Sequence, residues 1–241
     1  MISFFSNDAF VAGSPVLLGA DAAQHLRVLR TGVGERVQLR DGKGGAGEGV
    51  ISRVGKRSVT VDVAECSTID APQPVHLMVP VADRDRMLML AEKCTELGAT
   101  SWRPVMWRRS RSVGPLGDGP AFQARIFARM TAALTQSGGG WLPETHPSAS
   151  VSRAIAAAPE GTRLLLDADA DVWPGRAAMT SPVVIAIGPE GGLEPKERDE
   201  MVEAGFLPVR IARSILRFET AGIAALSVVR CLLEREGDDN V

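Results

Sequence analysis

The strongest constraint on this chain is an apolar run that ends in a glycine-rich turn. Residues 183–187 read VVIAI, GPEGG follows at 188–192, and a helix-like segment begins at Pro195. Five consecutive apolar residues are typical of a strand buried on both faces of a parallel sheet. Ligands of such sheets bind beyond the carboxyl ends of the strands, where glycines let the backbone approach closely. The run therefore predicts an α/β fold with a candidate binding loop at 188–192.

Strands and helices alternate on both sides of this run, from residue 75 to the C-terminus. The predicted strands lie at 75–81, 101–106, 163–166, 183–187 and 209–211. The predicted helices lie at 84–97, 121–134, 195–204 and 221–233.

The first 70 residues follow a different pattern, that of a small β-rich module. Short candidate strands are separated by Gly and Asp turns, at 2–5, 16–18, 37–40, 49–54 and 58–64. One helix, at 22–30, interrupts them with Leu26 and Leu29 on one face, and this combination predicts a small β-barrel. Pro72 and Pro74 mark a linker. We therefore expect two domains, 1–71 and 72–241.

Composition excludes several classes of protein. The net charge is −2, 23% of residues are charged and 45% are hydrophobic, which excludes a polycation and most disordered chains. No apolar run approaches the roughly 18 residues of a membrane span, and the N-terminus lacks the basic segment of a secretory signal. The three cysteines and three histidines are scattered. We expect a soluble, cytoplasmic protein that uses no metal.

Arginine dominates the positive charge. Only four of the 27 basic residues are lysine, and the segments 1–60 and 71–116 each carry an excess of three positive charges. Arginine suits contacts to phosphate and bases, although a GC-rich genome is the favoured explanation of the bias taken alone. Residues 102–111, WRPVMWRRSR, contain four Arg and two Trp with no acid. We favour nucleic-acid contact with base stacking here, the alternative being a solvated Arg loop with both Trp in the core.

The segment 211–221, IARSILRFETA, leads from a strand end into an apolar helix. Glu219 and Thr220 lie at the first helical turn, where an anion is favoured and a hydroxyl can cap free N–H groups. Arg217 precedes them. The segment contributes to a site, or Glu219 and Thr220 only cap the helix with Arg217 as their ion-pair partner. The residues leave both interpretations open.

These segments, in this order, resemble the SPOUT-class RNA methyltransferases, and most closely the RsmE family, which methylates N3 of a uridine in 16S ribosomal RNA. GPEGG at 188–192 and ILRFETA at 215–221 match the two C-terminal motifs of that family. KCTELG at 93–98, followed by Arg109 and Ser110, matches a helix end and the segment after it. HLRVLR at 25–30 and DGKG at 41–44 resemble its PUA-like barrel. The similarity spans nearly the whole chain.

The resemblance implies a PUA-like β-barrel followed by a SPOUT α/β domain with a C-terminal trefoil knot. It also implies S-adenosylmethionine (SAM) as cofactor, 16S rRNA of the small subunit as partner, and a homodimer that uses the last helix. The apolar face of that helix suits a dimer interface or core burial equally, and it consists of Ile223, Leu226, Val229 and Leu233.

The resemblance carries three sets of site residues onto this sequence. The cofactor-binding residues are Leu166, Gly188, Pro189, Glu190, Gly191, Gly192, Ile211, Ile215, Leu216, Thr220 and Ala221. The RNA-binding residues are Arg27, Arg30, Lys93, Arg108, Arg109 and Arg111.

The third set is catalytic and consists of Arg217 and Glu219. Arg217 is expected to hold a uracil oxygen or its phosphate, because its guanidinium stays charged at neutral pH. Glu219 is a candidate general base for the N3 proton, with Glu190 as the runner-up. Alternatively, Glu219 only orients Arg217 and solvent takes the proton.

The chain departs from the family pattern at several positions. Ser3, Gly140 and Ser214 stand where the family usually has arginine, Ala212 replaces a glycine, and residues 82–86 lack a lysine. These changes leave two further hypotheses open: methylation of another RNA position, and a catalytically weak RNA-binding factor for ribosome assembly. A nicotinamide dehydrogenase is disfavoured, because no GxGxxG follows a strand.

Overall fold

The computed structural model describes residues 1–110, 119–176 and 179–238. Packing divides the chain into two units. Unit 1 comprises Met1–Ala71 and Thr131–Leu142, and unit 2 comprises Pro72–Met130 and Pro143–Val241. Within the described residues, no helix is both long and apolar enough to cross a membrane.

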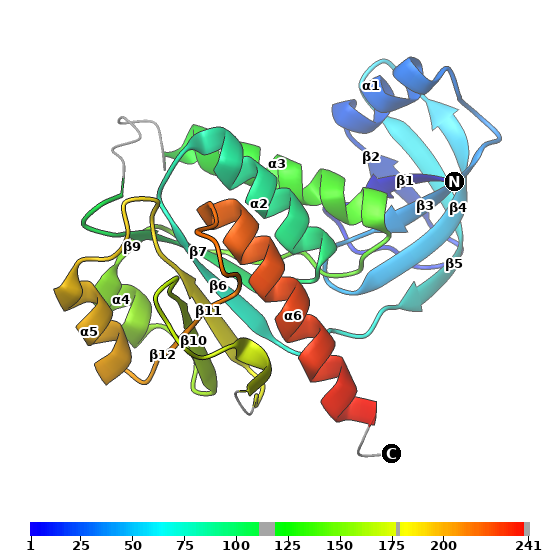
Figure 1. The fold of residues 1–241 in the computed structure, drawn as a ribbon. Coiled ribbons are helices and arrows are strands. Elements are labelled where there is room, and N and C mark those ends of the chain that lie inside the picture. The colour runs from blue at the N-terminus through cyan, green and yellow to red at the C-terminus, as the bar shows by residue number, and fades with distance from the viewer. Residues whose placement is uncertain (111–118, 177–178, 239–241) are drawn as a thin grey trace. The chain divides into compact units, whose positions relative to one another are not determined.

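Unit 1 is a curled five-stranded sheet with one helix (Figure 1). The strand order is β1-β3-β4-β5-β2, with β1 parallel to β3 and the other pairs antiparallel. The elements are β1 (Ile2–Phe5), β2 (Pro15–Leu18), α1 (Ala20–Leu29), β3 (Arg36–Arg40), β4 (Gly45–Val54) and β5 (Val59–Thr68). All five predicted strands are present, but the sheet ends in β1 and β2 rather than closing on itself. Leu26 of α1 is buried in the core, whereas Leu29, expected on the same face, is 47% exposed.

Residues 138–142 complete unit 1 from a distant part of the sequence. Trp141 forms a bridge with Lys43 and donates its indole N–H to the Ile69 carbonyl at 2.8 Å. Gly140 accepts a hydrogen bond from the Gly44 amide at 2.8 Å. A Cβ at Gly140 would lie 2.7 Å from Ile69 Cβ, so any side chain at this position would force Ile69 to shift.

Unit 2 contains a parallel sheet with the order β12-β10-β11-β6-β7-β8, and β9 also pairs with β7. Its strands are β6 (Val75–Pro80), β7 (Ser101–Met106), β8 (Glu144–Thr145), β9 (Ala149–Ser150), β10 (Thr162–Leu166), β11 (Val183–Ile187) and β12 (Leu207–Val209). Its helices are α2 (Arg84–Glu96), α3 (Pro120–Ser137, which enters unit 1), α4 (Val151–Ala156), α5 (Pro195–Glu203) and α6 (Phe218–Asp238), with a short 3₁₀ turn η1 (Pro174–Arg176).

Helices cover both faces of this sheet (Figure 1). The central strand β11 is buried along its whole length, as its apolar run predicted. Val184 and Ala186 belong to the core that α4 and α5 complete on one face. On the other face α6 packs against β11, β6 and α2. Gly222 of α6 makes this packing close, because a Cβ there would lie 2.8 Å from Ile187.

The apolar face of α6 serves the core of unit 2. Leu226, Val229 and Leu233 are each no more than 2% exposed, and Ile223 is half-buried. Of the two interpretations that the sequence left open for this face, core burial describes these three residues. A dimer interface on α6 therefore has to use other side chains, such as Val228, which is 37% exposed.

Arg230 of α6 joins three segments of unit 2 and carries a testable prediction. Its buried guanidinium donates to the carbonyls of Gln73, Leu97 (3.1 Å) and Gly98, the last two at the C-terminal end of α2. Burial lowers the pKa of Arg230. Arg230→Met keeps the apolar stem but leaves three carbonyls without their donor. We expect the free energy of unfolding to fall by about 3 kcal/mol.

Urea denaturation measures this loss, and Arg129→Met is the control. Arg129 is 51% exposed and pairs with Glu92 at 3.0 Å, so its replacement should cost less than about 1 kcal/mol. Equal losses for the two variants would show that the three carbonyls find water instead.

Candidate functional site

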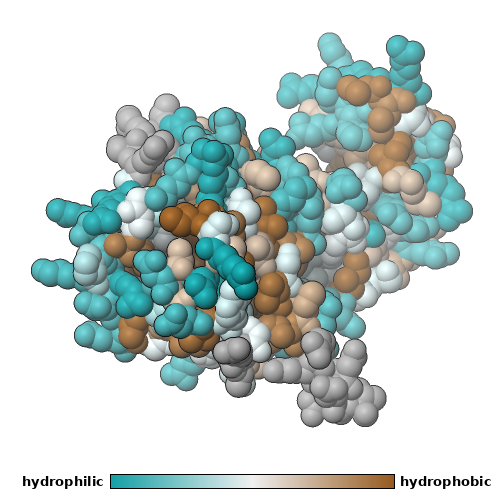
Figure 2. Space-filling model, viewed as in Figure 1, coloured by the Kyte–Doolittle hydropathy of each residue, from teal (hydrophilic) through white to brown (hydrophobic). Residues whose placement is uncertain are grey.

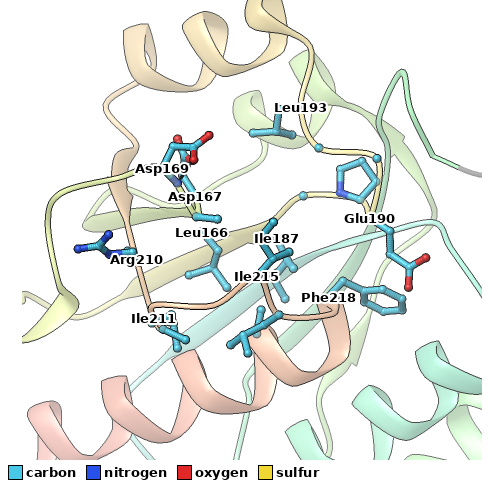
Figure 3. A pocket seen from close by; sticks show the side chains of 18 of the residues that line it. Leu166, Asp167, Asp169, Ile187, Glu190, Leu193, Arg210, Ile211, Ile215 and Phe218 are labelled. Atoms are coloured by element: carbon cyan, nitrogen blue, oxygen red, sulfur yellow. Dashed lines mark hydrogen bonds between the residues drawn. The ribbon is translucent and has the colours of Figure 1, made fainter.

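A cavity of about 620 Å³ lies at the carboxyl ends of β10, β11 and β12 (Figure 3). Its walls are the residues that follow each of these strands: 167–169, the loop 188–193 and the segment 210–216, with the first residues of α6. Strands that are parallel and adjacent bring these segments together although they are far apart in sequence. The volume falls in the range of roughly 300–1,000 Å³ found for small-molecule sites.

The cavity is polar at two opposite sides and apolar between them (Figure 3). Asp167, Asp169 and Arg210 lie on one side, and Glu190 lies on the other. The apolar residues between them are Leu166, Ile187, Ile211 and Ile215. Such a lining suits a ligand with a flat apolar part and charged ends.

The loop 188–192 is fixed at its C-terminal side by Arg109, which follows β7. Arg109 Nε donates to Glu194 Oε1 at 2.6 Å, and Nη1 donates to the Gly191 carbonyl at 3.1 Å. Glu194 also forms a capping box with Glu197 at the start of α5. Gly192 has a φ of +73°, which favours glycine. The path of the loop therefore depends on a glycine and on an arginine that follows β7, two strands away from β11 in the sheet.

The acidic side of the cavity has its own ion pair. Asp167 Oδ2 accepts from Arg198 Nε at 2.8 Å, and this hydrogen bond raises the pKa of Arg198. The Asp169 amide donates to Asp167 Oδ1 at 2.9 Å. Arg210 packs its guanidinium over the Trp173 ring at 5.3 Å, and its buried Nε has no hydrogen-bond partner.

On the other side, Glu190 lines the cavity, and a second carboxylate, Glu219, and a guanidinium, Arg86, lie beside it. Arg86, in the first turn of α2, forms an ion pair with Glu190 Oε1. Arg86 Nε also lies 3.9 Å from Glu219 Oε1. Glu219 is only 5% exposed, and its Oε2 is buried without a hydrogen-bond partner. Among the described residues, Arg86 is therefore the cation within ion-pair distance of Glu219. Arg217, the partner considered from the sequence, does not lie within that distance.

Ten of the eleven predicted cofactor-binding residues line the cavity, and Thr220 does not. Thr220 is exposed on α6. Arg217 is also exposed and lies between two lining residues, Leu216 and Phe218. Glu219 does not line the cavity, whereas Glu190 does. Ala212 and Ser214, two of the departures from the family, are lining residues as well.

The predicted RNA-binding residues fall in both units. Arg27 is exposed and donates to the Lys56 carbonyl at 2.9 Å and to Gln24 at 2.6 Å, and Arg30 is exposed at the end of α1. Lys93 pairs with Glu92 and Glu96, whose hydrogen bonds raise the pKa of Lys93. Arg108 is exposed, and its amide donates to Glu197 at 2.6 Å. Arg111 lies outside the described residues.

The two tryptophans of the segment 102–111 correct one interpretation. Trp102 is fully buried and Trp107 is 3% exposed. Neither ring can stack on a base without opening the core, so the stacking surface favoured from the sequence is wrong. The alternative, with both tryptophans in the core, is what the structure shows.

Sequence reasoning missed several charged residues of the site: Arg86, Asp167, Asp169, Arg198 and Arg210. Asp167 and Arg210 each follow directly on the last residue of a parallel strand. Position at a strand end was therefore a usable indication for these two residues. Arg86 and Arg198 reach the site from helices, and no local pattern marks them. No group of three or more metal-ligating side chains occurs in the part of the chain that the structure describes.

The family of RNA methyltransferase domains matches residues 70–230, and an RNA methyltransferase PUA domain matches residues 18–64. A ribosomal RNA small subunit methyltransferase E from Synechocystis is 27% identical over 86% of this chain and 70% of its own. The protein of that name from Mycobacterium bovis is 26% identical over 92% of this chain and 88% of its own.

Two solved structures share the fold of the whole chain. The ribosomal RNA small subunit methyltransferase E of Neisseria gonorrhoeae, bound to SAM, superposes with a TM-score of 0.88 at 28% identity, covering 96% of this chain and 98% of that one. A Legionella pneumophila protein in complex with SAM superposes with a TM-score of 0.90 at 27% identity, covering 96% of this chain and 97% of that one.

The fold and the cavity define a ligand-binding α/β unit that is joined to a curled, PUA-type β unit. With the match over two thirds of its length, the chain belongs to the family of RNA methyltransferases.

Proposed function

We propose that this protein transfers a methyl group from SAM to N3 of a specific uridine in the 16S rRNA of the small ribosomal subunit. The observation that carries the proposal is the cavity at the carboxyl ends of β10, β11 and β12, lined by the GPEGG loop and the segment 210–216. Relatives named as small subunit methyltransferase E, and similar structures that contain SAM, support it. The N3 position rests on the resemblance to the RsmE family.

The residues of the cavity fit SAM. Its apolar middle, with Ile187 and Ile211, can cover the adenine ring. Arg210 supplies a positive charge suited to the carboxylate of the methionine part, and Asp169 is an acceptor suited to its ammonium group. Glu190, on the opposite side, is a lining carboxylate whose charge is balanced by its ion pair with Arg86.

When bound, SAM supplies the activated methyl group. The protein has to align uridine N3 with that group, remove the N3 proton and stabilise the charge on the ring. Arg217, exposed beside the cavity, is the proposed contact for a uracil oxygen or phosphate. Glu219 and Glu190 are the proposed bases, and Glu190 has the more direct access because it lines the cavity.

We further propose that residues 1–71 act as the PUA-like RNA-binding module and 72–241 as the methyltransferase domain, with a C-terminal trefoil knot. The strand order supports a knot, because the chain passes from β11 across β10 to β12 and returns by 210–217 to α6, which packs on β11 and β6. The proposed RNA contacts are Arg27, Arg30, Lys93, Arg108, Arg109 and Arg111.

A homodimer through α6 is also proposed, in the cytoplasm where small subunits are made. Hydrophobic residues are exposed on the side of unit 2 where α6 runs (Figure 2). The exposed large hydrophobic residues of unit 2 include Val228 on α6, Met89 on α2 and Ile215 beside the cavity. Light scattering should give twice the 25.6 kDa mass of the chain.

The decisive experiment incubates the protein with labelled SAM and small subunits from a strain that lacks the enzyme, and then maps the label. Label at N3 of one 16S uridine supports the proposal. Label at another nucleotide would keep the cofactor and change the target. Cofactor binding without any label would indicate an RNA-binding assembly factor instead.

A further inference from the structure

Arg86 lies beside the cavity, on a helix that contributes no lining residue, and contacts Glu190, which lines it. It lies in the first turn of α2, where its amide donates to Asp83 Oδ1 at 3.1 Å and so fixes the start of the helix. Its guanidinium contacts Glu190 of the GPEGG loop and faces Glu219 of α6. Figure 3 shows the Glu190 side chain leaving the loop toward Phe218, away from Arg210. One side chain thus connects two walls of the cavity.

The buried carboxylate fixes the position of this arginine. The Glu219 side chain is 7% exposed and Arg86 is 29% exposed. A buried carboxylate without a cation is strongly unfavourable, so Arg86 has to stay beside Glu219. The N-terminal end of α6 adds positive potential to the same carboxylate, because Glu219 is in its first turn. Glu219 therefore anchors Arg86, and the remaining donors of Arg86 are free for Glu190.

The GPEGG loop is held from two directions. Arg109 holds Gly191 and Glu194 on the side of α5. Glu190 is held by Arg86 on the side of α6, and in the described residues it has no second ion pair. The two arginines follow the carboxyl ends of the neighbouring strands β6 and β7. Loss of Arg86 would leave the loop fixed at one end.

We propose that Arg86 is a positioning residue that ties the GPEGG loop, through Glu190, to the first turn of α6, through Glu219. The tie sets the separation of the two cavity walls. Its consequence for SAM binding rests on the proposed function, but its consequence for the loop does not.

Hydrogen exchange of the ligand-free protein tests the tie directly. Arg86→Met alone leaves Glu219 buried without a cation, so we expect a lower melting temperature as well as a loosened loop. The double variant Arg86→Met/Glu219→Gln removes the unpaired charge and should recover stability. In both variants, amides of the peptide 188–193 should exchange about tenfold faster than in the wild type, since a charge-assisted contact is lost.

The matched control is Arg125→Met. Arg125 is exposed and lies 4.0 Å from an exposed Asp85, so its replacement should change neither the melting temperature nor the exchange rate at 188–193. Glu190→Gln breaks the same tie from the loop side, and should speed exchange at 188–193 without a large loss of stability. If the double variant is stable and its loop exchanges at the wild-type rate, Arg86 only neutralises Glu219 and the proposal is wrong.

Calorimetry with SAM extends the test to the cofactor. We expect the Kd for SAM to rise about tenfold in the double variant and to stay unchanged in Arg125→Met. A wild-type Kd in the double variant would overturn the role in shaping the cavity. If the wild-type protein does not bind SAM, the proposed cofactor is wrong, while the exchange data still decide whether Arg86 holds the loop.

Discussion

Arg217→Ala should lower the rate of methyl transfer to small subunits by about 10²- to 10³-fold, the loss typical when one donor to a developing negative charge is removed. The side chain is exposed and lies between Leu216 and Phe218, both of which line the cavity. In the described part of the chain it makes no ion pair and no side-chain hydrogen bond. Its removal should therefore leave the melting temperature and the Kd for SAM unchanged.

Arg213→Ala is the control for this prediction, because Arg213 is also exposed between two lining residues of the same segment but lies outside the ILRFETA motif at 215–221. It should change kcat little. Equal losses for the two variants would mean that the segment contributes only positive charge for RNA binding. Arg217→Lys keeps the charge but not the planar guanidinium. Its rate of methyl transfer should therefore lie between those of the wild type and Arg217→Ala. Turnover within twofold of wild type in Arg217→Ala would remove this residue from the mechanism.

Elements with a long local pattern could be predicted from the sequence almost to their ends. The strands at β7 and β11 and the helix at α2 match their predicted bounds within one residue. The two-residue strands β8 and β9 and the six-residue helix α4 were missed. Such elements are too short to repeat a hydrophobic pattern several times, so their positions depend on pairing with β7 and on the core rather than on their own residues.

The candidate site was predictable where its residues are consecutive. The GPEGG loop and the segment 211–216 could be named because glycines and strand ends mark them. The ion pair between Arg86 and Glu190 joins residues more than one hundred positions apart. The order of the strands in the sheet brings the two residues together, and this order cannot be read from the local pattern of residues. The same limit applies to Asp167 and Arg198, which pair across the cavity rim.

Arginine-rich, aromatic segments are ambiguous for a physical reason that Trp102 illustrates. A tryptophan on a strand suits a base as well as a core, and only the burial of the strand decides between them. In β7 the alternate residues point into two covered faces, so Trp102 is enclosed completely. The arginines remain at the surface because the strand ends there. Stability, rather than RNA affinity, should therefore respond to changes at Trp102.

Trp102→Ala should lower the free energy of unfolding by about 3–5 kcal/mol, since it removes a fully buried aromatic side chain. Trp102→Phe should cost less than half of that, because it keeps most of the ring volume. It also removes an indole N–H that is buried without a partner. Urea denaturation of the two variants gives both values.

Met106→Ala, at a 56% exposed position of the same strand, is the matched control and should stay within about 0.5 kcal/mol of wild type. RNA affinity should be unchanged in Trp102→Phe. If Trp102→Ala instead kept wild-type stability and bound small subunits more weakly, the ring would be accessible to RNA after all. That result would reinstate base stacking, because a side chain that packs in the core cannot be removed without a loss of folding free energy.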